Sequence, residues 1–182
     1  WGGSHAFAAR RAGSLLGELL YERGKLEEAE RLLDEGCKLG AGGGLVDFKL
    51  ARYAAGARIK MLRGDRSTAA QRLDEGARTA ATLGLPRLRA RIENERVRLG
   101  LPPTAGLEPP SRAEYATRRR PVEGIDAITA QLEEDTAIRL LIADDSPETT
   151  RLACTWAQEW VNMLEGSGRR RALLQAKRLL DG

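Results

Sequence analysis

The sequence has few of the residues on which catalysis, metal binding and β-structure depend. Its 182 residues include one histidine, two cysteines and only 4% aromatic residues. A metal site needs several Cys, His or carboxylate ligands at suitable spacing, so we expect no metal, no cofactor and no catalytic residue. A β-sandwich would contain more valine, threonine and aromatic residues. Alanine, leucine and arginine dominate instead, which predicts an all-α, non-enzymatic segment.

The rare residues also bear on location. Cys37 and Cys154 lie in separate helical patterns, so we expect two buried, reduced thiols rather than a disulfide. His5 stands near one end and is expected to be solvated. No apolar run reaches the roughly 18 residues of a membrane span. The chain starts with neither Met nor a signal-peptide pattern. We therefore expect a cytoplasmic segment of a longer protein, without a membrane partner.

One stretch of the chain returns 40 positions later without a gap. Of its fourteen positions, 23–36, seven are identical in 63–76, including Arg-Gly at the start and Leu-Asp-Glu-Gly at the end. Repeats of this length are typical of solenoids, in which each unit buries its apolar face only against its neighbours. Such scaffolds usually bind other molecules, so the repeat predicts a binding function.

Apolar residues at helical spacing, interrupted by glycine and proline, predict an array of helices. Gly24 and Gly64 end the first helix of each repeat, and the Gly-rich run 40–44 joins the two repeats. That run lacks the Gly-Lys-Ser/Thr of a phosphate-binding loop and is expected to be a connector. Pro86 and Pro147 suit the first position of a helix. The expected helices are 6–22, 26–39, 45–62, 66–82, 86–99, 122–143, 147–165 and 169–181.

Composition divides the chain into three parts. Residues 1–99 hold two helix pairs and the first helix of a third. Residues 100–121 carry five of the seven prolines and three consecutive arginines, so we expect a loop without helix. Residues 122–182 hold three more helices that continue the solenoid and stop where a partner helix is due. The last helix is therefore expected to expose an apolar face.

The two repeats resemble tetratricopeptide repeats, which have small residues where two helices cross and glycine at the turn. The period here is 40 rather than about 34 residues, and the usual Trp and Pro are missing. The resemblance implies antiparallel helix pairs stacked in a right-handed superhelix. The residues that carry it are Leu16, Gly17, Gly24, Ala29 and Gly36 in the first unit and Ala57, Gly64, Ala69, Leu73 and Gly76 in the second.

Longer runs extend this resemblance to one class of regulator. Residues 83–88 (LGLPRL) and 95–99 (ERVRL) are similar to the superhelical repeat region of MalT-type, ATP-dependent, LuxR-type bacterial transcription activators. A similar region occurs in actinobacterial Ser/Thr kinases of the protein kinase K type, and 130–135 and 171–176 look like that branch. The family implies an ATPase or kinase module before this region and, in some members, a DNA-reading module after it. No motif of these modules is visible in the chain.

The resemblance also implies a binding surface, because the first helix of each pair lines the groove of a tetratricopeptide superhelix. By that analogy the groove would be lined by Arg11, Ser14, Glu18, Tyr21, Arg58 and Met61. An ordinary solvated face explains the polar residues among them equally well. The predicted occupant is a small-molecule effector, a protein partner or another domain of the parent chain.

Two further features have both a functional and a plain interpretation. Arg169, Arg170 and Arg171 follow a glycine at a helix start and could hold an anion, or they form a turn with solvated arginines. The run 118–120 has the same two interpretations. Trp156 and Trp160 are four residues apart on one helix, so they either pack in a core or form an exposed partner face.

These observations favour a non-catalytic sensor or protein-interaction module of a MalT-type regulator that binds an effector or partner in its groove. The alternative is the regulatory or docking region of a Ser/Thr kinase of the protein kinase K type. Direct nucleic-acid binding through the arginine clusters is a third and less favoured hypothesis, because the net charge is only +4.

Overall fold

A computed structural model describes residues 2–38, 46–118, 120–121 and 123–180, with side chains from Ala12 onward. Every regular element in these ranges is helical, which confirms the all-α prediction. The elements are α1 (Gly2–Glu22), α2 (Leu26–Lys38), α3 (Val46–Leu50), the π-helix η1 (Ala51–Ala55), α4 (Gly56–Leu62), α5 (Arg66–Leu83), α6 (Pro86–Arg98), α7 (Arg112–Thr117), α8 (Gly124–Ala143), α9 (Pro147–Leu164) and α10 (Arg170–Leu180).

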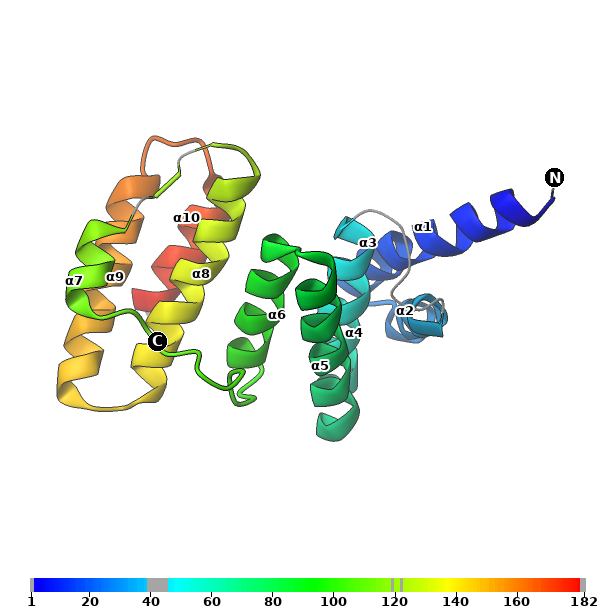
Figure 1. Cartoon of the computed structure of the whole chain (residues 1–182), viewed down its shortest axis with the longest axis horizontal. Helices are drawn as coiled ribbons and strands as arrows, with labels where there is room; N and C mark the ends of the chain where they lie inside the picture. The colour runs from blue at the N-terminus through cyan, green and yellow to red at the C-terminus, as the bar shows by residue number, and fades with distance from the viewer. Residues whose placement is uncertain (1, 39–45, 119, 122, 181–182) are drawn as a thin grey trace. The chain divides into compact units, whose positions relative to one another are not determined.

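The chain forms two compact units, Trp1–Leu101 and Pro102–Gly182, called unit 1 and unit 2 (Figure 1). Unit 1 contains α1 to α6, and unit 2 contains α7 to α10. None of the described helices is both long and apolar enough to cross a membrane. His5 and the side chain of Arg11 lie outside the described side chains, and the Gly-rich run 40–44 lies outside the described residues.

Unit 1 is built from helix pairs joined by glycine turns. The first pair is α1 and α2, and the second joins the α3–η1–α4 segment to α5. Gly24 and Gly64 end the first helix of each pair with φ of 75° and 80°, a left-handed conformation that favours glycine. α6 then packs against α5, α3 and η1. Pro86 is at the start of α6, as predicted.

Small residues allow the helices to cross closely. A Cβ atom on Gly36 would lie 2.5 Å from Ser14 Oγ, and one on Gly76 would lie 2.6 Å from Ile92 Cδ1. Ala29 and its repeat counterpart Ala69 are fully buried. Any Cβ at either glycine would force neighbouring side chains to move, which agrees with the small residues expected where two helices cross.

The predicted helix 45–62 is not a regular α-helix. Its middle is the π-helix η1, a feature for which hydrophobic periodicity carries no signal. All of η1 is buried, and its two polar side chains turn inward. Arg52 donates from Nη1 to the Gly36 carbonyl oxygen at 2.8 Å and from Nη2 to Tyr53 Oη at 2.6 Å. Tyr53 Oη in turn lies 3.0 Å from Thr79 Oγ1. η1 therefore joins the two repeats through buried hydrogen bonds.

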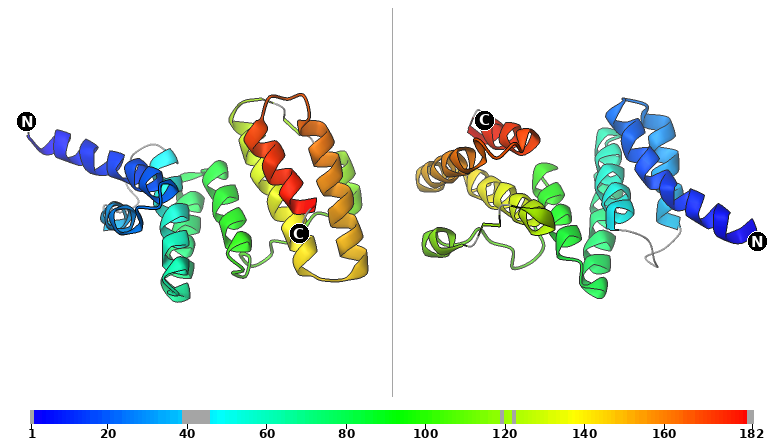
Figure 2. Two further views of the ribbon diagram at one scale, coloured as in Figure 1. Left: turned by 180° about the vertical axis from the view of Figure 1, so that it is seen from behind. Right: turned by 90° about the horizontal axis from the view of Figure 1, so that it is seen from above.

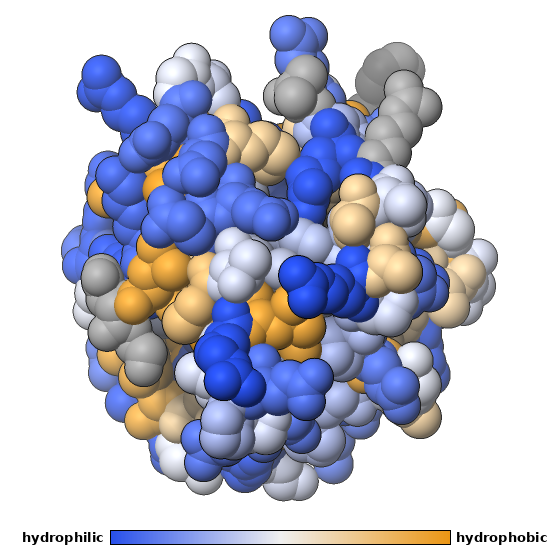
Figure 3. Space-filling view, turned by 90° about the vertical axis from the view of Figure 1, so that its left-hand side faces the viewer, coloured by the Kyte–Doolittle hydropathy of each residue, from blue (hydrophilic) through white to orange (hydrophobic). Residues whose placement is uncertain are grey.

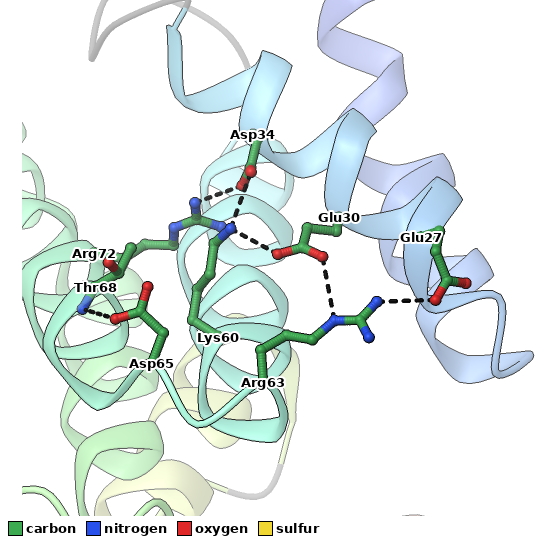
Figure 4. A network of polar contacts seen from close by, with 8 residues as sticks. All are labelled: Glu27, Glu30, Asp34, Lys60, Arg63, Asp65, Thr68 and Arg72. Atoms are coloured by element: carbon green, nitrogen blue, oxygen red, sulfur yellow. Dashed lines mark hydrogen bonds and ion pairs between the residues drawn. The ribbon is translucent and has the colours of Figure 1, made fainter.

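A second polar network joins the repeats through α2, α4 and α5 (Figure 4). Lys60 Nζ donates to Glu30 at 2.7 Å and to Asp34 at 3.1 Å. Arg72 Nη2 also donates to Asp34, at 2.6 Å, and Arg63 Nε lies 3.5 Å from Glu30. Because each carboxylate is shared between cations from the next repeat, this network sets the register of the two pairs.

Unit 2 is a three-helix bundle, α8 to α10, with the short helix α7 packed on it (Figure 2). Ser146 caps α9, and Pro147 is in the first turn of this helix, as predicted for the proline. α7 lies inside the stretch 100–121, which we expected to contain no helix. Its Ser111–Glu114 capping box is a signal that the proline-rich context obscured. The core of unit 2 includes Tyr115, Ile138, Leu141, Trp156, Ala157, Trp160, Val161, Leu164, Ala172 and Ala176.

The tryptophans of unit 2 are core residues. Trp156 and Trp160 are each 2% exposed, so they form no partner face. The Tyr115 ring stacks on Trp156 with centroids 3.6 Å apart and an interplanar angle of 1°. Tyr115 Oη donates to the Glu134 carboxylate, and the Arg120 guanidinium lies 4.4 Å from the ring centroid. These contacts fix α7 to α8 and α9 through one side chain.

Burial corrects two expectations. Cys154 is exposed and Cys37 is half-buried, so only part of the predicted thiol burial is found. Leu16, expected to pack in the first pair, is 51% exposed. Leu15 and Leu19 are also exposed, whereas their counterparts 40 residues later, Ala55 and Ile59, are fully buried. The counterparts are buried because the first pair covers them, and no described residue covers the first pair in that way.

Apolar side chains also reach the surface elsewhere. Figure 3 shows hydrophobic patches between hydrophilic residues on one face of the molecule. Leu62, Ile125 and Leu174 are the most exposed large apolar residues in the described part of the chain, at 63%, 62% and 60%. On α10, Ala172, Ala176 and Leu179 are buried while Leu174 and Leu180 are exposed. The apolar side predicted for the last helix is therefore partly core and partly surface.

Candidate functional site

The predicted groove residues that the structure brings together lie where α1, α4 and α6 meet. Tyr21 on α1 and Arg58 on α4 face one another, with the guanidinium carbon 5.9 Å from the ring centroid. Glu18, one turn before Tyr21, is close enough for its charge to act on Arg58. Arg58 reaches onward to Glu95 on α6. We call Glu18, Tyr21, Arg58, Arg91 and Glu95 the A-helix cluster.

Glu95 is the buried anion of this cluster. Its side chain is 1% exposed, and both carboxylate oxygens accept from Arg58, each at 2.6 Å. Burial lowers the pKa of the Arg58 guanidinium, but the hydrogen bonds and charge of Glu95 outweigh this, so the pKa is raised. Tyr21 and Glu18 add to that rise. Arg58 is therefore a permanent cation whose fork is matched to one carboxylate.

Arg91 is a second cation on the same face. Its Nε lies 3.9 Å from Glu95 Oε2, too far for a hydrogen bond, and its side chain is 21% exposed. Burial lowers the pKa of Arg91, and the charges of Arg58 and Arg98 lower it further, against the opposing charges of Glu95 and Glu18. Two guanidinium groups thus share one buried carboxylate, and only Arg58 hydrogen-bonds to it.

The other predicted groove residues lie elsewhere. Ser14 is 3% exposed and sits beneath Gly36, so it belongs to the contact between α1 and α2 and offers no binding group. Met61 is half-buried and packs at the edge of the core of the second pair. Arg11 has no described side chain. The structure therefore brings Glu18, Tyr21 and Arg58 together and places Ser14 in a helix contact. A groove function for any of these residues stays a prediction.

Sequence reasoning missed Arg91 and Glu95. Their spacing of four residues puts them on one face of α6, which the sequence shows, but such pairs are usually solvated. The signal that separates this pair is its burial, which arises only when α6 packs beside the second helix pair. Extending the groove analogy to the first helix of the third pair would have drawn attention to this face.

The three arginines of the predicted anion site, residues 169–171, differ in their surroundings. Arg169 is half-buried, and its Nη2 donates to Gln131 Oε1 at 2.5 Å and to the Ala127 carbonyl oxygen at 3.3 Å. It therefore fastens the start of α10 to α8. Arg170 and Arg171 are exposed. An anion site that uses all three guanidinium groups remains a prediction, and it would require Arg169 to leave α8.

Of the arginines at 118–120, the two that the structure describes form ion pairs with glutamates of α8. Arg118 Nη2 donates to Glu133 at 2.5 Å, and Arg120 Nη2 lies 3.5 Å from Glu134. Arg119 lies outside the described residues. Among the residues that the structure describes, no group of three or more His, Cys, Asp or Glu residues could hold a metal ion. The chemistry that the A-helix cluster supports is recognition by charge, hydrogen bonds and an aromatic ring.

Comparison with known proteins shows that the chain is similar in sequence to part of a kinase. It is 49% identical over 175 residues to the serine/threonine-protein kinase PknK of Mycobacterium tuberculosis, in strains H37Rv and CDC 1551, and of Mycobacterium bovis. The alignment covers 96% of this chain but only 16% of each kinase. No protein-family model and no solved structure matches the chain. The chain is therefore homologous to one segment of a much longer kinase.

That segment is not the catalytic domain of the kinase. The sequence has neither the His-Arg-Asp nor the Asp-Phe-Gly motif that protein kinases use. The catalytic lysine of protein kinases lies on a β-strand, and the described residues of this chain contain no strand. The homology supports the kinase hypothesis over the MalT-type hypothesis, since it is a kinase whose sequence matches along almost the entire chain.

Proposed function

We propose that this chain is a regulatory, docking region of a serine/threonine kinase, which binds a protein segment over the face formed by α1, α4 and α6. The observation that carries the proposal is its 49% identity with a non-catalytic segment of PknK. A helical segment without catalytic groups contributes to a kinase by positioning something, either a substrate or another part of the same protein. We further propose that unit 1 is a tetratricopeptide-like superhelix, as its glycine-turn helix pairs suggest.

The A-helix cluster is the best candidate for the contact surface. Tyr21 and Arg58 combine aromatic and cationic groups, the residue types enriched where binding energy concentrates in protein interfaces. The ion pair of Arg58 with Glu95 holds its guanidinium in place before a partner arrives, so little side-chain freedom is lost on binding. We propose that the docked segment passes over Tyr21 and Arg91, with Glu18 at its border.

Two other functions have weaker support. A sensor of a transcription activator would use the same face, but the matching relatives are named as kinases. Direct nucleic-acid binding needs arginines free to reach phosphates. Many described arginines are engaged within the chain instead, as at Arg58, Arg72 and Arg118. Neither function is favoured by an observation of its own.

Deleting residues 1–101 from the full-length protein tests the proposal. Autophosphorylation and phosphorylation of protein substrates would be compared with the intact protein, together with binding of the purified chain to the kinase catalytic domain. A docking region predicts that substrate choice or basal activity changes while ATP affinity does not. Identical activity towards every substrate, with no binding to the catalytic domain or to substrates, would contradict the proposal. The variant Tyr21→Ala should reproduce part of the effect, whereas Leu62→Ala, an exposed residue near the end of α4, should not.

A further inference from the structure

The A-helix cluster contains two arginines beside one buried carboxylate, and only one of them, Arg58, forms hydrogen bonds to it. Arg58 occupies both oxygens of Glu95 with its own fork. Arg91 remains 3.9 Å from Glu95, and its guanidinium forms no hydrogen bond to any described residue. The Arg91 side chain is only 21% exposed, so burial removes part of its hydration without a hydrogen bond to Glu95 in return. The missing partner is an anion that can accept from Arg91.

The surrounding charges define what kind of anion can bind. Arg58 and Arg98 lie close enough to act on Arg91 as like charges, and Glu95 and Glu18 act as opposite charges. Glu95 is already neutralised by its bidentate pair with Arg58, so Arg91 and Arg98 face one remaining carboxylate, that of Glu18. The local balance leaves room for a single additional negative group. A run of several acidic residues would meet repulsion from Glu18.

We propose that Arg91 binds one anionic group of a docked peptide, a carboxylate or a phosphoryl group, through the planar fork of its guanidinium. The planar guanidinium of an arginine can donate two parallel hydrogen bonds to a carboxylate or to a phosphoryl group. The ammonium group of a lysine lacks this geometry. Tyr21, which lies beside Arg58, supplies a ring on which the neighbouring part of the peptide packs. The inference rests on the proposed docking function and assigns its chemical specificity: one negative side chain within an otherwise uncharged stretch.

Titration with short peptides tests this assignment directly. The probes are capped pentapeptides of four alanines with phosphoserine, glutamate or serine in the centre. The readout is the Nε–Hε resonance of Arg91 in heteronuclear NMR of the intact chain. We expect saturable shifts with the phosphoserine and glutamate peptides, with dissociation constants on the order of 1 mM, and no saturation with the serine peptide. Binding of the phosphoserine peptide alone would assign the group as phosphoryl, and binding of the glutamate peptide alone would assign it as carboxylate.

Three variants separate specific recognition from general charge attraction. Arg91→Gln should weaken binding about tenfold or more, because a hydrogen bond to a charged group is lost. Arg89→Gln removes the same charge from an exposed position on α6 and should change affinity by less than about twofold. Glu18→Gln should tighten binding by roughly two- to fivefold, because it removes the nearby repulsion. Far-ultraviolet circular dichroism checks that each variant is folded.

Two outcomes would overturn the inference. One is saturable binding that Arg91→Gln and Arg89→Gln weaken equally, which would show only general attraction to a basic surface. The other is the absence of any saturable shift at Arg91 with all three peptides up to about 20 mM, well above the expected dissociation constant. Neither result would decide the docking function, which the deletion of residues 1–101 tests by kinase activity. Conversely, if the deletion leaves kinase activity towards every substrate unchanged and the chain binds neither the catalytic domain nor substrates, docking is contradicted, while peptide binding at Arg91 would still establish the anion site.

Discussion

Arg58 on α4 and Glu95 on α6 form two parallel hydrogen bonds, Nε to Oε1 and Nη2 to Oε2, each 2.6 Å long. The pair joins the second helix pair to the first helix after it. Glu95 is 1% exposed and Arg58 is 15% exposed, so water supplies little of their solvation. The charge on Glu95 is tolerated at this depth because the guanidinium satisfies both of its oxygens.

Truncating Arg58 should therefore destabilise the protein strongly. Arg58→Ala leaves the Glu95 carboxylate buried with only Arg91 nearby, and breaking such a pair costs about 3–5 kcal/mol. Urea unfolding followed by circular dichroism would measure the change in the free energy of unfolding. The exposed pair of Arg31 and Glu35, 64% and 50% exposed, is the matched control. Arg31→Ala should cost less than about 1 kcal/mol.

The double variant Arg58→Met with Glu95→Met tests whether the loss comes from the unpaired charge. Replacing both partners by apolar residues removes the buried carboxylate as well as the cation. We expect this variant to recover most of the stability that Arg58→Ala loses, since such replacements are often neutral or stabilising. A double variant as unstable as Arg58→Ala would show that packing of the arginine stem, rather than its charge, holds α4 against α6.

The same substitution should have opposite effects at two helical glycines. A Cβ on Gly76 would lie 2.6 Å from Ile92 Cδ1 and 3.0 Å from Tyr53 Cγ, so Gly76→Ala should destabilise by about 1–3 kcal/mol through overpacking. A Cβ on Gly13 would meet nothing closer than Leu32 Cδ2, at 3.8 Å. Gly13→Ala should stabilise by roughly 0.5–1 kcal/mol, because alanine restricts the unfolded chain and favours helix. Thermal unfolding midpoints that move in the same direction would refute the close crossing at Gly76.

Acid should weaken the network between the repeats through Asp34. Burial raises the pKa of this carboxyl, but hydrogen bonds and charges from Arg72 and Lys60 outweigh it, so the pKa is lowered from its ordinary value of 3.8. A group with a lowered pKa in the folded state stabilises it above the unfolded pKa, and the contribution is lost as pH falls through the folded value. Asp34→Asn should be less stable at neutral pH and lose less stability between pH 5 and about pH 2. If the unfolding free energies of Asp34→Asn and of the unsubstituted protein changed with pH in parallel, Asp34 would not be the group that acid titrates.

Tyr115 should control whether α7 stays on unit 2. Tyr115→Phe keeps the stack on Trp156 but removes the hydroxyl that donates to Glu134, and it should cost about 1–2 kcal/mol. Tyr115→Ala also removes the ring and should cost about 3–5 kcal/mol. Near-ultraviolet circular dichroism should then lose tryptophan signal in the alanine variant and retain it in the phenylalanine variant. Equal spectra for both variants would show that α7 is held by other contacts.

Local signals made the helices predictable from the sequence. Gly24 and Gly64 end helices because only glycine readily adopts their left-handed conformation, and Ser146 begins one because its side chain accepts a backbone hydrogen bond. Gly36 and Gly76 could be assigned to close crossings because the repeat placed them at equivalent positions. α7 and η1 escaped prediction, since a six-residue helix has little periodicity and a π-turn has no pattern in side-chain polarity.

The candidate site was only half visible in the sequence. Helical spacing shows which residues share a face, as it does for Glu18 with Tyr21 and for Arg91 with Glu95. It does not show which face a neighbouring helix covers. For that reason the sequence did not show that Ser14 lies beneath Gly36 or that the Glu95 side chain is buried.

The sequence by itself determined that this protein is helical, repetitive and without catalytic motifs, because those properties depend on composition, on local periodicity and on turns of a few residues. The tertiary structure alone decided that Arg58 closes on Glu95 and that Arg91 is left with donors to spare. Burial and charge pairing between residues 37 positions apart depend on how the α4 and α6 helices pack, and that packing is set by many side chains at once.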